Sequence, residues 1–511
     1  MSKVIMVQGT MSNVGKSWLV GGLCRIFKQD GYKVAPFKSQ NMALNSFVTS
    51  DGLELGRAQA MQAECAGVAP SVYMNPILLK PTNDVGSQVI VNGEVIGNMP
   101  AREYFAYKKK LIPDILNAYN ALQKENDIIV IEGAGSPAEI NLKENDIVNM
   151  GLAKLVNAPV ILVGDIDRGG VFAQLLGTLE LLESEERRRV KGLIINKFRG
   201  DKSLLDSGID MIEDMGHVPV IGTIPYQKLM IDDEDSLSER LISKSISTNS
   251  DNKVNIAVIR FPRISNYTDI APFESIDGIN VIFTDKREDI ENADMVILPG
   301  SKNTISDLRW LRESGLEIII KRFAKAHPVI GICGGFQMLG KIIKDPYIVE
   351  EGGEIRGMEL IPTVTTLLSH KTRRQINGNL GNLFSPWSAL SGKPYTGYEI
   401  HMGESRMDTI NFHYNENSRT NYVEKDSSEN IILLQSGNIL GTYVHGIFDE
   451  GDIALNIARN LASLKGVSLE SSETDYMSFK EKEYDKLADA IRSNLDMQYI
   501  YEILEKSDSE L

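Results

Sequence analysis

The sequence predicts an α/β protein with two consecutive domains, the first of which is built on a doubly wound parallel sheet. Two observations lead to this prediction. Short runs of Val and Ile alternate with helical stretches over the first 230 or so residues, which is typical of parallel strands covered by helices on both faces. A second series of the same kind starts at residue 254, after a polar stretch rich in Ser, Asp and Asn.

The expected strands follow one another along the chain. In the first series they are residues 4–7, 33–36, 127–131, 159–163, 192–195 and 219–221. In the second series they are residues 254–259, 295–298, 328–332 and 439–444, with antiparallel strands and loops in the polar region 367–429. The predicted parts of the chain are therefore a first domain at 1–235, a linker at 236–253, a second domain at 254–452 and a helical extension at 453–511.

The composition is that of a soluble globular protein, with 42% hydrophobic and 24% charged residues among 511. No apolar run reaches the roughly 18 residues that a membrane-spanning helix needs, and the N-terminus shows no signal-peptide pattern. We therefore expect a cytoplasmic protein without a membrane span. The net charge of −15 disfavours nucleic acid as a partner, and three cysteines without a CxxC pair argue against a disulfide framework.

The first expected strand runs into a glycine-rich loop, GTMSNVGKS at residues 9–17, and a helical stretch follows. A phosphate-binding (Walker A) loop needs this context, because its backbone N–H groups and the helix N-terminus cradle phosphates. The spacing is one residue longer than usual, and Met11 stands where ATPases that dimerise over nucleotide carry lysine. The expected cofactors are ATP, bound by Gly9, Thr10, Asn13, Val14, Gly15, Lys16 and Ser17, and Mg²⁺, bound by Ser17.

Carboxylates at strand ends are candidates for a further Mg²⁺ ligand. Glu132 is the first candidate, because it follows the apolar strand 127–131 at the sheet edge where the phosphate loop is expected. Asp51 and Glu54 are weaker candidates. Asn196 ends another strand of the same sheet, where its side-chain amide could read adenine.

In the second series, the strand at 328–332 runs into Cys333, and two glycines and a helical stretch follow. This is the layout of a nucleophile elbow with cysteine in the place of serine. The helix N-terminus favours the thiolate, and the glycines leave room for a substrate above the sulfur. The backbone amides of Gly300, in the turn PGSK, and of Gly334 are expected to form an oxyanion hole.

A cysteine nucleophile needs a base, and the chain has six histidines. His445 is the expected base because it lies in GTYVHGIFD, at the end of the last apolar strand, where a triad histidine would sit. His401, in GYEIHMG, is the alternative.

These motifs carry a resemblance to known families. With its PGSK turn, GICGGFQMLG elbow and YVHGIFD segment, the second half is similar to class I (triad-type) glutamine amidotransferases. With its phosphate loop and the segment EGAG, the first half resembles the dethiobiotin-synthetase-like ATPases. The two halves in this order, with the runs FKSQNMA, MNPILLKP, INKFRGD and ISNYTD, resemble the cobyric acid synthase family over nearly the whole chain.

The chain departs from one common pattern of class I amidotransferases, the motif H-x-E in which Glu orients the catalytic His. Ile447 stands at the position of that Glu, and the cobalamin branch resembles this sequence in lacking it. Asp449 or Glu399 would then orient His445, or no residue would.

The resemblance implies an ATP-dependent, glutamine-hydrolysing amidation of four peripheral carboxylates (b, d, e and g) of adenosylcobyrinic acid a,c-diamide, which gives adenosylcobyric acid. It implies that Cys333 releases ammonia from glutamine while the first domain activates each carboxylate as an acyl phosphate. The expected partners are therefore small molecules: the corrinoid polycarboxylate, glutamine and ATP. The candidate cations for substrate carboxylates or phosphates are Lys38, Lys80, Arg168, Lys197 and Arg199.

Three alternatives remain at this stage. A cobyrinic acid a,c-diamide synthase would use the same chemistry on two other carboxylates, and the runs FKSQNMALN and MNPILLKP argue against it. A regulatory P-loop ATPase with an inactive amidotransferase-like domain is disfavoured by Cys333, His445 and Met11. The third alternative is a cysteine hydrolase whose first half only senses nucleotide.

Overall fold

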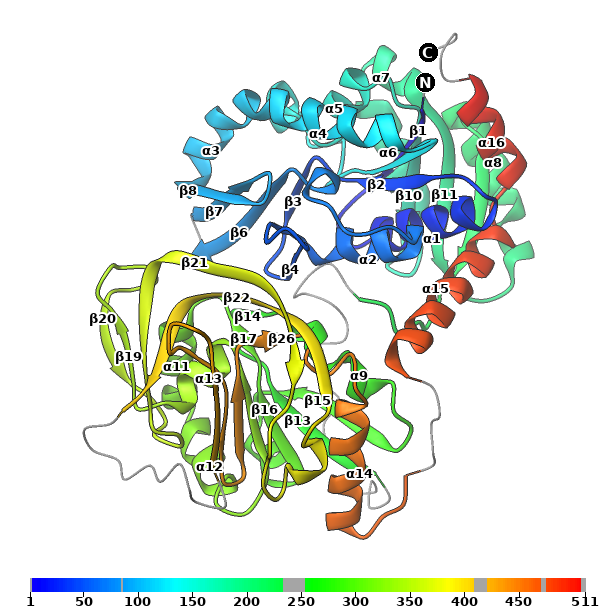
Figure 1. The fold of residues 1–511 in the computed structure, drawn as a ribbon. Helices are drawn as coiled ribbons and strands as arrows, with labels where there is room; N and C mark the ends of the chain where they lie inside the picture. The colour runs from blue at the N-terminus through cyan, green and yellow to red at the C-terminus, as the bar shows by residue number, and fades with distance from the viewer. Residues whose placement is uncertain (1, 84–85, 233–252, 409–420, 470–474, 507–511) are drawn as a thin grey trace. The chain divides into compact units, whose positions relative to one another are not determined.

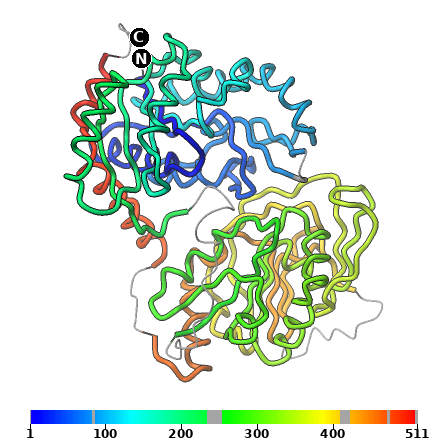
Figure 2. The backbone as a smooth tube through the Cα atoms, turned by 180° about the vertical axis from the view of Figure 1, so that it is seen from behind, coloured from blue at the N-terminus to red at the C-terminus, as the bar shows by residue number. Residues whose placement is uncertain are grey.

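The computed structural model describes residues 2–83, 86–232, 253–408, 421–469 and 475–506. These residues form two compact units, and each unit contains segments that are distant in sequence. The first unit takes its residues from Met1–Ala43, Glu54–Glu234 and Lys480–Leu511, and the second from Leu44–Leu53 and Asp235–Phe479. Figure 1 and Figure 2 show how the first unit combines the two ends of the chain: the red C-terminal helices lie beside the blue N-terminal elements.

A six-stranded sheet forms the centre of the first unit, in the order β12-β11-β10-β1-β9-β2 with every pair parallel. Its strands are β1 (Lys3–Gly9), β2 (Val34–Phe37), β9 (Ile128–Glu132), β10 (Val160–Asp165), β11 (Val190–Phe198) and β12 (Val220–Pro225). Alternate residues of β1 belong to different core clusters, Val4 and Met6 to one and Ile5 and Val7 to the other. Both faces of the sheet are therefore covered, and the predicted doubly wound parallel sheet is confirmed.

The helices of the first unit are α1 (Lys16–Gln29), α2 (Arg57–Ala66), α3 (Ala101–Tyr107), α4 (Ile112–Glu125), α5 (Met150–Leu155), α6 (Val171–Leu181), α7 (Ser184–Arg189), α8 (Asp206–Gly216) and α16 (Met497–Lys506), with most of α15 (Tyr476–Arg492). A second sheet of four strands, which the sequence reasoning did not predict, runs β3-β6-β7-β8. Its strands are β3 (Gln40–Met42), β6 (Ile77–Asn83), β7 (Gly86–Val91) and β8 (Glu94–Pro100), and β5 (Glu54–Gly56) lies in the same unit.

The second unit is built on a seven-stranded sheet in the order β15-β13-β16-β18-β25-β24-β23. Five strands are parallel: β15 (Ile279–Thr284), β13 (Val254–Ile259), β16 (Met295–Leu298), β18 (Val329–Ile332) and β25 (Ile439–Thr442). β24 (Ile431–Ser436) and β23 (Asn421–Lys425) continue the sheet in the antiparallel sense. The second α/β series is thereby confirmed.

A five-stranded sheet in the order β20-β19-β21-β22-β26 completes the second unit. Its long hairpin of β21 (Thr363–Asn379) and β22 (Pro394–Met407) is antiparallel, in agreement with the prediction for this polar region. The other strands are β19 (Ile342–Asp345), β20 (Gly353–Arg356) and β26 (Val444–His445), besides the short strands β4 (Ser46–Val48), β14 (Ile264–Ser265) and β17 (Gly300–Ser301).

The helices of the second unit are α9 (Ala271–Glu274), α10 (Arg287–Glu291), α11 (Thr304–Glu313), α12 (Leu316–Phe323), α13 (Gly334–Leu339) and α14 (Ile453–Lys465). In both units, no helix within the described part of the chain is long and apolar enough to cross a membrane.

The structure divides the chain differently from the predicted boundaries in two places. The expected extension 453–511 is split: α14 packs in the second unit, whereas the chain from Lys480 onward belongs to the first unit. The reason is that apolar residues of α15 and α16 complete the hydrophobic core on one face of the six-stranded sheet. Residues 44–53 also leave the predicted first domain for the second unit, and nearly all of the predicted linker 236–253 lies outside the described residues.

Candidate functional site

The phosphate loop lies between β1 and α1, as predicted, and its geometry depends on glycine. Gly15 precedes α1 with φ +96°, a left-handed conformation that favours glycine. A Cβ on Gly9 would lie 2.5 Å from Cγ2 of Val14, so the loop is closely packed against itself. Lys16 Nζ donates to the carbonyl oxygens of Met11 (3.0 Å) and Gly135 (3.2 Å), which holds the ammonium group against the loop.

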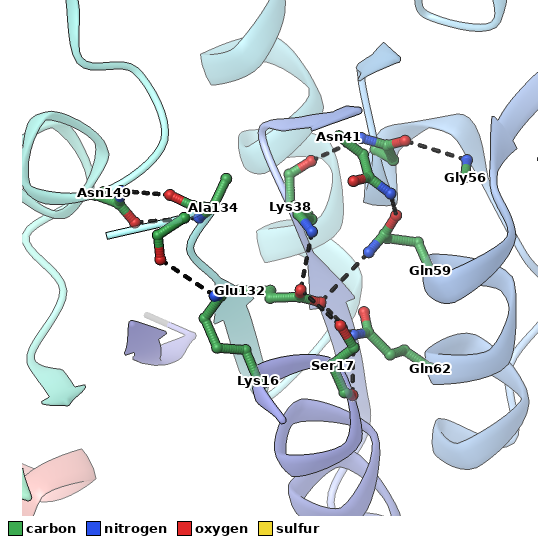
Figure 3. A network of polar contacts seen from close by, with 12 residues as sticks. Lys16, Ser17, Lys38, Asn41, Gly56, Gln59, Gln62, Glu132, Ala134 and Asn149 are labelled. Carbon is green, nitrogen blue, oxygen red and sulfur yellow. Dashed lines mark hydrogen bonds and ion pairs between the residues drawn. The ribbon is translucent and has the colours of Figure 1, made fainter. Parts of the chain in front are cut away.

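Glu132, at the end of β9, is fully buried in a network of polar side chains (Figure 3). Its Oε1 accepts hydrogen bonds from Ser17 Oγ and from Lys38 Nζ, both at 2.9 Å. Its Oε2 accepts from Gln62 Nε2 at 2.6 Å and from Gln59 Nε2 at 3.5 Å. These donors come from α1, the end of β2 and α2, and they offset the cost of burying a carboxylate.

The Ser17 hydroxyl and the Glu132 carboxylate fit a Mg²⁺ site. Both supply oxygen atoms, the ligands that Mg²⁺ prefers, and they already lie 2.9 Å apart beside the phosphate loop. In the described residues there is no group of three or more His, Cys, Asp or Glu side chains that could hold a metal alone. Mg²⁺ that is bound together with nucleotide needs only one or two protein ligands, so the pair agrees with the predicted role.

Asp51 and Glu54, the weaker metal candidates, make other contacts. Asp51 is exposed and accepts a hydrogen bond from Thr49 Oγ1, in the segment that belongs to the second unit. Glu54 is buried and pairs with Lys80, with 2.6 Å between Nζ and Oε1. Lys38, through its contact with Glu132, and Lys80 are therefore both members of buried ion pairs, and their predicted contact with substrate carboxylates stays a prediction.

The other predicted binding residues lie around the end of β11 and the loop after β10. Asn196 Nδ2 donates to the carbonyl oxygen of Val14 at 2.7 Å, so its amide supports the phosphate loop. Lys197 Nζ donates to the carbonyl oxygen of Asn13 at 2.6 Å and pairs with Asp165 at 2.9 Å. Arg199 pairs with Asp167 and Arg168 is exposed, so these two cations are accessible at the same edge of the sheet.

In the second unit, Cys333 joins β18 to α13 in a strained backbone conformation, with φ +51° and ψ −108°. A residue with a side chain seldom adopts this region, and a nucleophile elbow is one place where it persists. The glycines around it are needed for packing: a Cβ on Gly335 would lie 2.0 Å from the carbonyl oxygen of Leu298, and a Cβ on Gly331 would lie 2.5 Å from Leu339. The structure thus has the predicted strand–cysteine–helix turn.

His445 is held by a carboxylate that the sequence reasoning missed. Its Nδ1 donates to Asp269 Oδ2 at 2.7 Å, and the backbone N–H of Gly446 donates to Asp269 Oδ1 at 2.9 Å. The candidates Glu399 and Asp449 are therefore wrong for this role. Glu399 instead pairs with Arg374 and lies 3.6 Å from Nε2 of His401.

Asp269 had one signal in the sequence, its place at the end of the run ISNYTD.

The other histidine candidate, His401, does not make at Nδ1 a contact like the one between His445 and Asp269. Its Nδ1 contacts the carbonyl oxygen of Gly403 at 2.7 Å, and its ring stacks on Tyr443 at 3.9 Å between centroids. The contacts therefore favour His445 as the base.

The pKa of His445 reflects both of its partners. Burial lowers this pKa, but the Asp269 carboxylate and the Cys333 sulfur raise it, and the result is a pKa of about 10. Nε2 is buried and has no hydrogen-bond partner among the described residues. An imidazolium is therefore the stable form at neutral pH, and it places a positive charge beside the Cys333 sulfur.

The predicted oxyanion-hole segments lie against each other. A Cβ on Gly334 would lie 2.8 Å from the backbone nitrogen of Ser301, and Gly335 N–H donates to the carbonyl oxygen of Pro299 at 3.1 Å. The PGSK turn therefore packs on the elbow, with Ser301, the residue after Gly300, beside Gly334, and the predicted oxyanion hole stays a prediction.

His445 is expected to titrate near pH 10 in the native protein, because the Asp269–His445–Cys333 arrangement stabilises the imidazolium. Cys333→Ala is expected to lower this pKa, since the negative sulfur is removed. Ring ¹⁵N chemical shifts measured by NMR as a function of pH test this, with His445→Gln to assign the resonance. A wild-type ring that titrates near the ordinary value of 6.5 would contradict the ion pair.

Comparisons with known proteins match two stretches of the chain. Residues 5–237 match the CobQ/CobB/MinD/ParA nucleotide binding domain, and residues 255–453 match the CobB/CobQ-like glutamine amidotransferase domain. The chain is 57% identical to the cobyric acid synthase of Lachnoclostridium phytofermentans, over 99% of this chain and 100% of that protein. It is 54% identical to the cobyric acid synthase of Ruminiclostridium cellulolyticum, over 99% of this chain and 98% of that protein.

Proposed function

Since the chain belongs to the cobyric acid synthase family, the ATP-dependent, glutamine-hydrolysing amidoligases of cobalamin synthesis, we propose that each unit carries one half of its reaction. The observation that supports this division is that each unit holds its own buried polar site. Glu132 and Ser17 lie at the phosphate loop of the first unit, and Cys333, His445 and Asp269 meet in the second. The substrate is a corrinoid polycarboxylate, of which the carboxylates b, d, e and g become amides.

The first unit activates each carboxylate. An oxygen of the substrate carboxylate attacks the γ-phosphorus of ATP, the bond to the oxygen that bridges the β- and γ-phosphorus breaks, and ADP leaves with that oxygen. The product is an acyl phosphate, whose carbonyl carbon is a much better electrophile than that of a carboxylate. The loop amides and Lys16 hold the phosphates in this step, and Lys16 offsets the repulsion between the two anions.

Mg²⁺ would be held by the Ser17 hydroxyl and the Glu132 carboxylate, and when bound it supplies positive charge beside the phosphates. Lys38 forms a buried ion pair with Glu132, and this contact offsets part of the cost of burying the carboxylate. Gln62 and Gln59 orient the second carboxylate oxygen.

The second unit supplies ammonia. The Cys333 thiolate attacks the side-chain amide carbon of glutamine, and the amides of the elbow and of the PGSK turn stabilise the resulting oxyanion. His445 gives its Nε2 proton to the leaving nitrogen, the C–N bond breaks, and a thioester remains on Cys333. Water, activated by the now neutral His445, cleaves the thioester and releases glutamate. Ammonia then attacks the acyl phosphate, and inorganic phosphate leaves.

The experiment that tests this function is analysis of the products by mass spectrometry after incubation of the protein with adenosylcobyrinic acid a,c-diamide, ATP, Mg²⁺ and glutamine. We expect four carboxylates to become amides, with one ADP and one glutamate for each amide. Omission of ATP is the control and is expected to give no amide. A parallel incubation with cobyrinic acid tests the alternative: amidation of that substrate at only the a and c positions, with none of the a,c-diamide, would identify the related diamide synthase. No corrinoid product from either substrate would contradict the proposal.

A further inference from the structure

The segment Leu44–Leu53, which we call the clasp, is an unexpected part of the second unit. The chain enters it directly after Ala43 and leaves it directly before Glu54, and both of these residues belong to the first unit. The clasp is closely packed: Asn45, Ser46 and Val48 are completely buried. A surface loop of ten residues would not need such burial, so the segment has a defined place in the second unit.

One end of the clasp is fixed to the turn that carries Asp269. The backbone N–H of Asn266 donates to Asn45 Oδ1 at 2.7 Å, and the backbone N–H of Ser46 donates to Asn266 Oδ1 at 3.0 Å. Asn266 has φ +50° and starts the 3₁₀ turn Tyr267–Ile270, in which Asp269 N–H donates to the Asn266 carbonyl oxygen at 3.2 Å. Two reciprocal hydrogen bonds thus fix the residue from which the turn starts.

The clasp also contacts the residue that packs on His445. Tyr398 donates its hydroxyl to the carbonyl oxygen of Ser46 at 2.9 Å, and its ring lies edge-on to Phe47 at 5.2 Å between centroids. The same ring stacks on His445, at 5.5 Å between centroids and 26° between planes. The clasp therefore supports both members of the Asp269–His445 pair, one through a turn and the other through a stacked ring.

The clasp is covalently close to the polar site of the first unit. Lys38, which pairs with Glu132, precedes the clasp by six residues. Between them, Asn41 Nδ2 donates to Gln59 Oε1 at 3.0 Å, and Gln59 is itself a hydrogen-bond donor to Glu132 (Figure 3). A short stretch of chain thus runs from the Glu132 network directly into the contacts that hold Asp269.

We propose that Asn45 is a positioning residue for the Asp269–His445 pair, contributed by the clasp, which stands in the sequence between two stretches of the first unit. It acts through the backbone of Asn266, which fixes the turn, and through Ser46, which fixes Tyr398. Asn45 Nδ2 is buried without a hydrogen-bond partner in the described residues, so the arrangement is kept at some cost in stability. The inference rests on the proposed role of His445 as the base.

The test compares four variants. Asn45→Ala removes the acceptor for Asn266 N–H, and Asn266→Gly removes the acceptor for Ser46 N–H but tolerates a positive φ. Asn266→Asp keeps this acceptor and also tolerates a positive φ, and Ser50→Ala changes an exposed residue of the clasp. We expect Asn45→Ala and Asn266→Gly to lower kcat for glutamine hydrolysis by up to about 10²-fold, the effect of a small misplacement of catalytic groups. KM for glutamine is expected to change little. Ser50→Ala is expected to stay near the wild type, and Asn266→Asp is expected to lose less activity than Asn266→Gly because it keeps the acceptor for Ser46 N–H.

Two further measurements separate positioning from general damage. Amidation driven by added ammonia needs no triad, so it is expected to be unchanged in Asn45→Ala, and the pKa of His445 is expected to fall towards its ordinary value as Asp269 moves away. Unchanged glutamine hydrolysis and an unchanged pKa in Asn45→Ala would overturn the inference. Equal loss of the ammonia-driven and glutamine-driven reactions in both Asn45→Ala and Asn266→Gly would also overturn it. If Cys333→Ala still hydrolyses glutamine, the proposed function itself fails, which is a distinct result.

Discussion

Cys333→Ala is expected to abolish amide formation with glutamine and to leave amide formation with added ammonia close to that of the wild type. The reason is that the thiolate is the only proposed nucleophile for glutamine, whereas the acyl phosphate forms in the other unit. The alanine removes only the sulfur, and the strained turn and its neighbouring glycines stay as they are. Rates of amide formation with each nitrogen source, at saturating ATP and corrinoid, test this expectation.

Lys16→Ala is the matched variant in the first unit. It is expected to lower both reactions by about 10²–10³-fold, the size of effect found when one donor to a developing charge is removed. Because Lys16 donates to Met11 and Gly135 through its side chain, the loop also loses a support, and nucleotide affinity has to be measured alongside the rates. If Cys333→Ala loses the ammonia-driven reaction as well, the division of the reaction between the two units is wrong.

Asp269→Asn is expected to lower glutamine hydrolysis by about 10⁴-fold, as when a triad carboxylate is replaced by its amide. The variant removes the charge that raises the pKa of His445, and it offers Nδ1 an amide group that can stabilise the wrong tautomer. A neutral His445 no longer places a positive charge beside the attacking sulfur, so attack on glutamine is the step that slows. The measurements are kcat/KM for glutamine as a function of pH and the rate of inactivation by a thiol-alkylating reagent.

The control for this variant is Asp449→Asn, which changes a carboxylate near His445 in the sequence. Because Asp269 occupies Nδ1, the change at Asp449 is expected to have a small effect on glutamine hydrolysis. Ammonia-driven amidation is expected to be the same in both variants. An equal loss of glutamine hydrolysis in Asp449→Asn would show that the geometry around His445 is misassigned.

The sequence correctly predicted the position of those parts of the site that are formed by residues adjacent in the chain. The phosphate loop and the Cys333 elbow each combine a strand, a glycine-containing turn and a helix within a few residues, so the local pattern is sufficient. Asp269 could not be found in this way, because it precedes Cys333 by 64 residues and comes from a separate short turn. The common H-x-E pattern also directs attention downstream of His445, where this chain has Ile447.

The fold shows the same difference between features with a local sequence pattern and features without one. The six strands of the first sheet are Val/Ile-rich runs buried on both faces, and the sequence shows them directly. The four-stranded sheet was missed because β8 is largely exposed and has no such run. The sheet did have local signals: the apolar runs 77–79 and 89–91, and the pair Asn92-Gly93, which has φ +49° and +81° and joins β7 to β8 in a tight hairpin. The amphipathic pattern of α15 and α16 predicted helices but could not say which core they cover.

The docking of α15 and α16 in the first unit has a consequence for the order of events during translation. Leu487 and Ile491 of α15 and Ile500 of α16 are buried in one core cluster with Leu23 of α1, which is synthesised at the opposite end of the chain. Domains usually fold from the N-terminus as they emerge from the ribosome. Because the core of the first unit includes residues of α15 and α16, we expect this core to be complete only after the second unit has been synthesised.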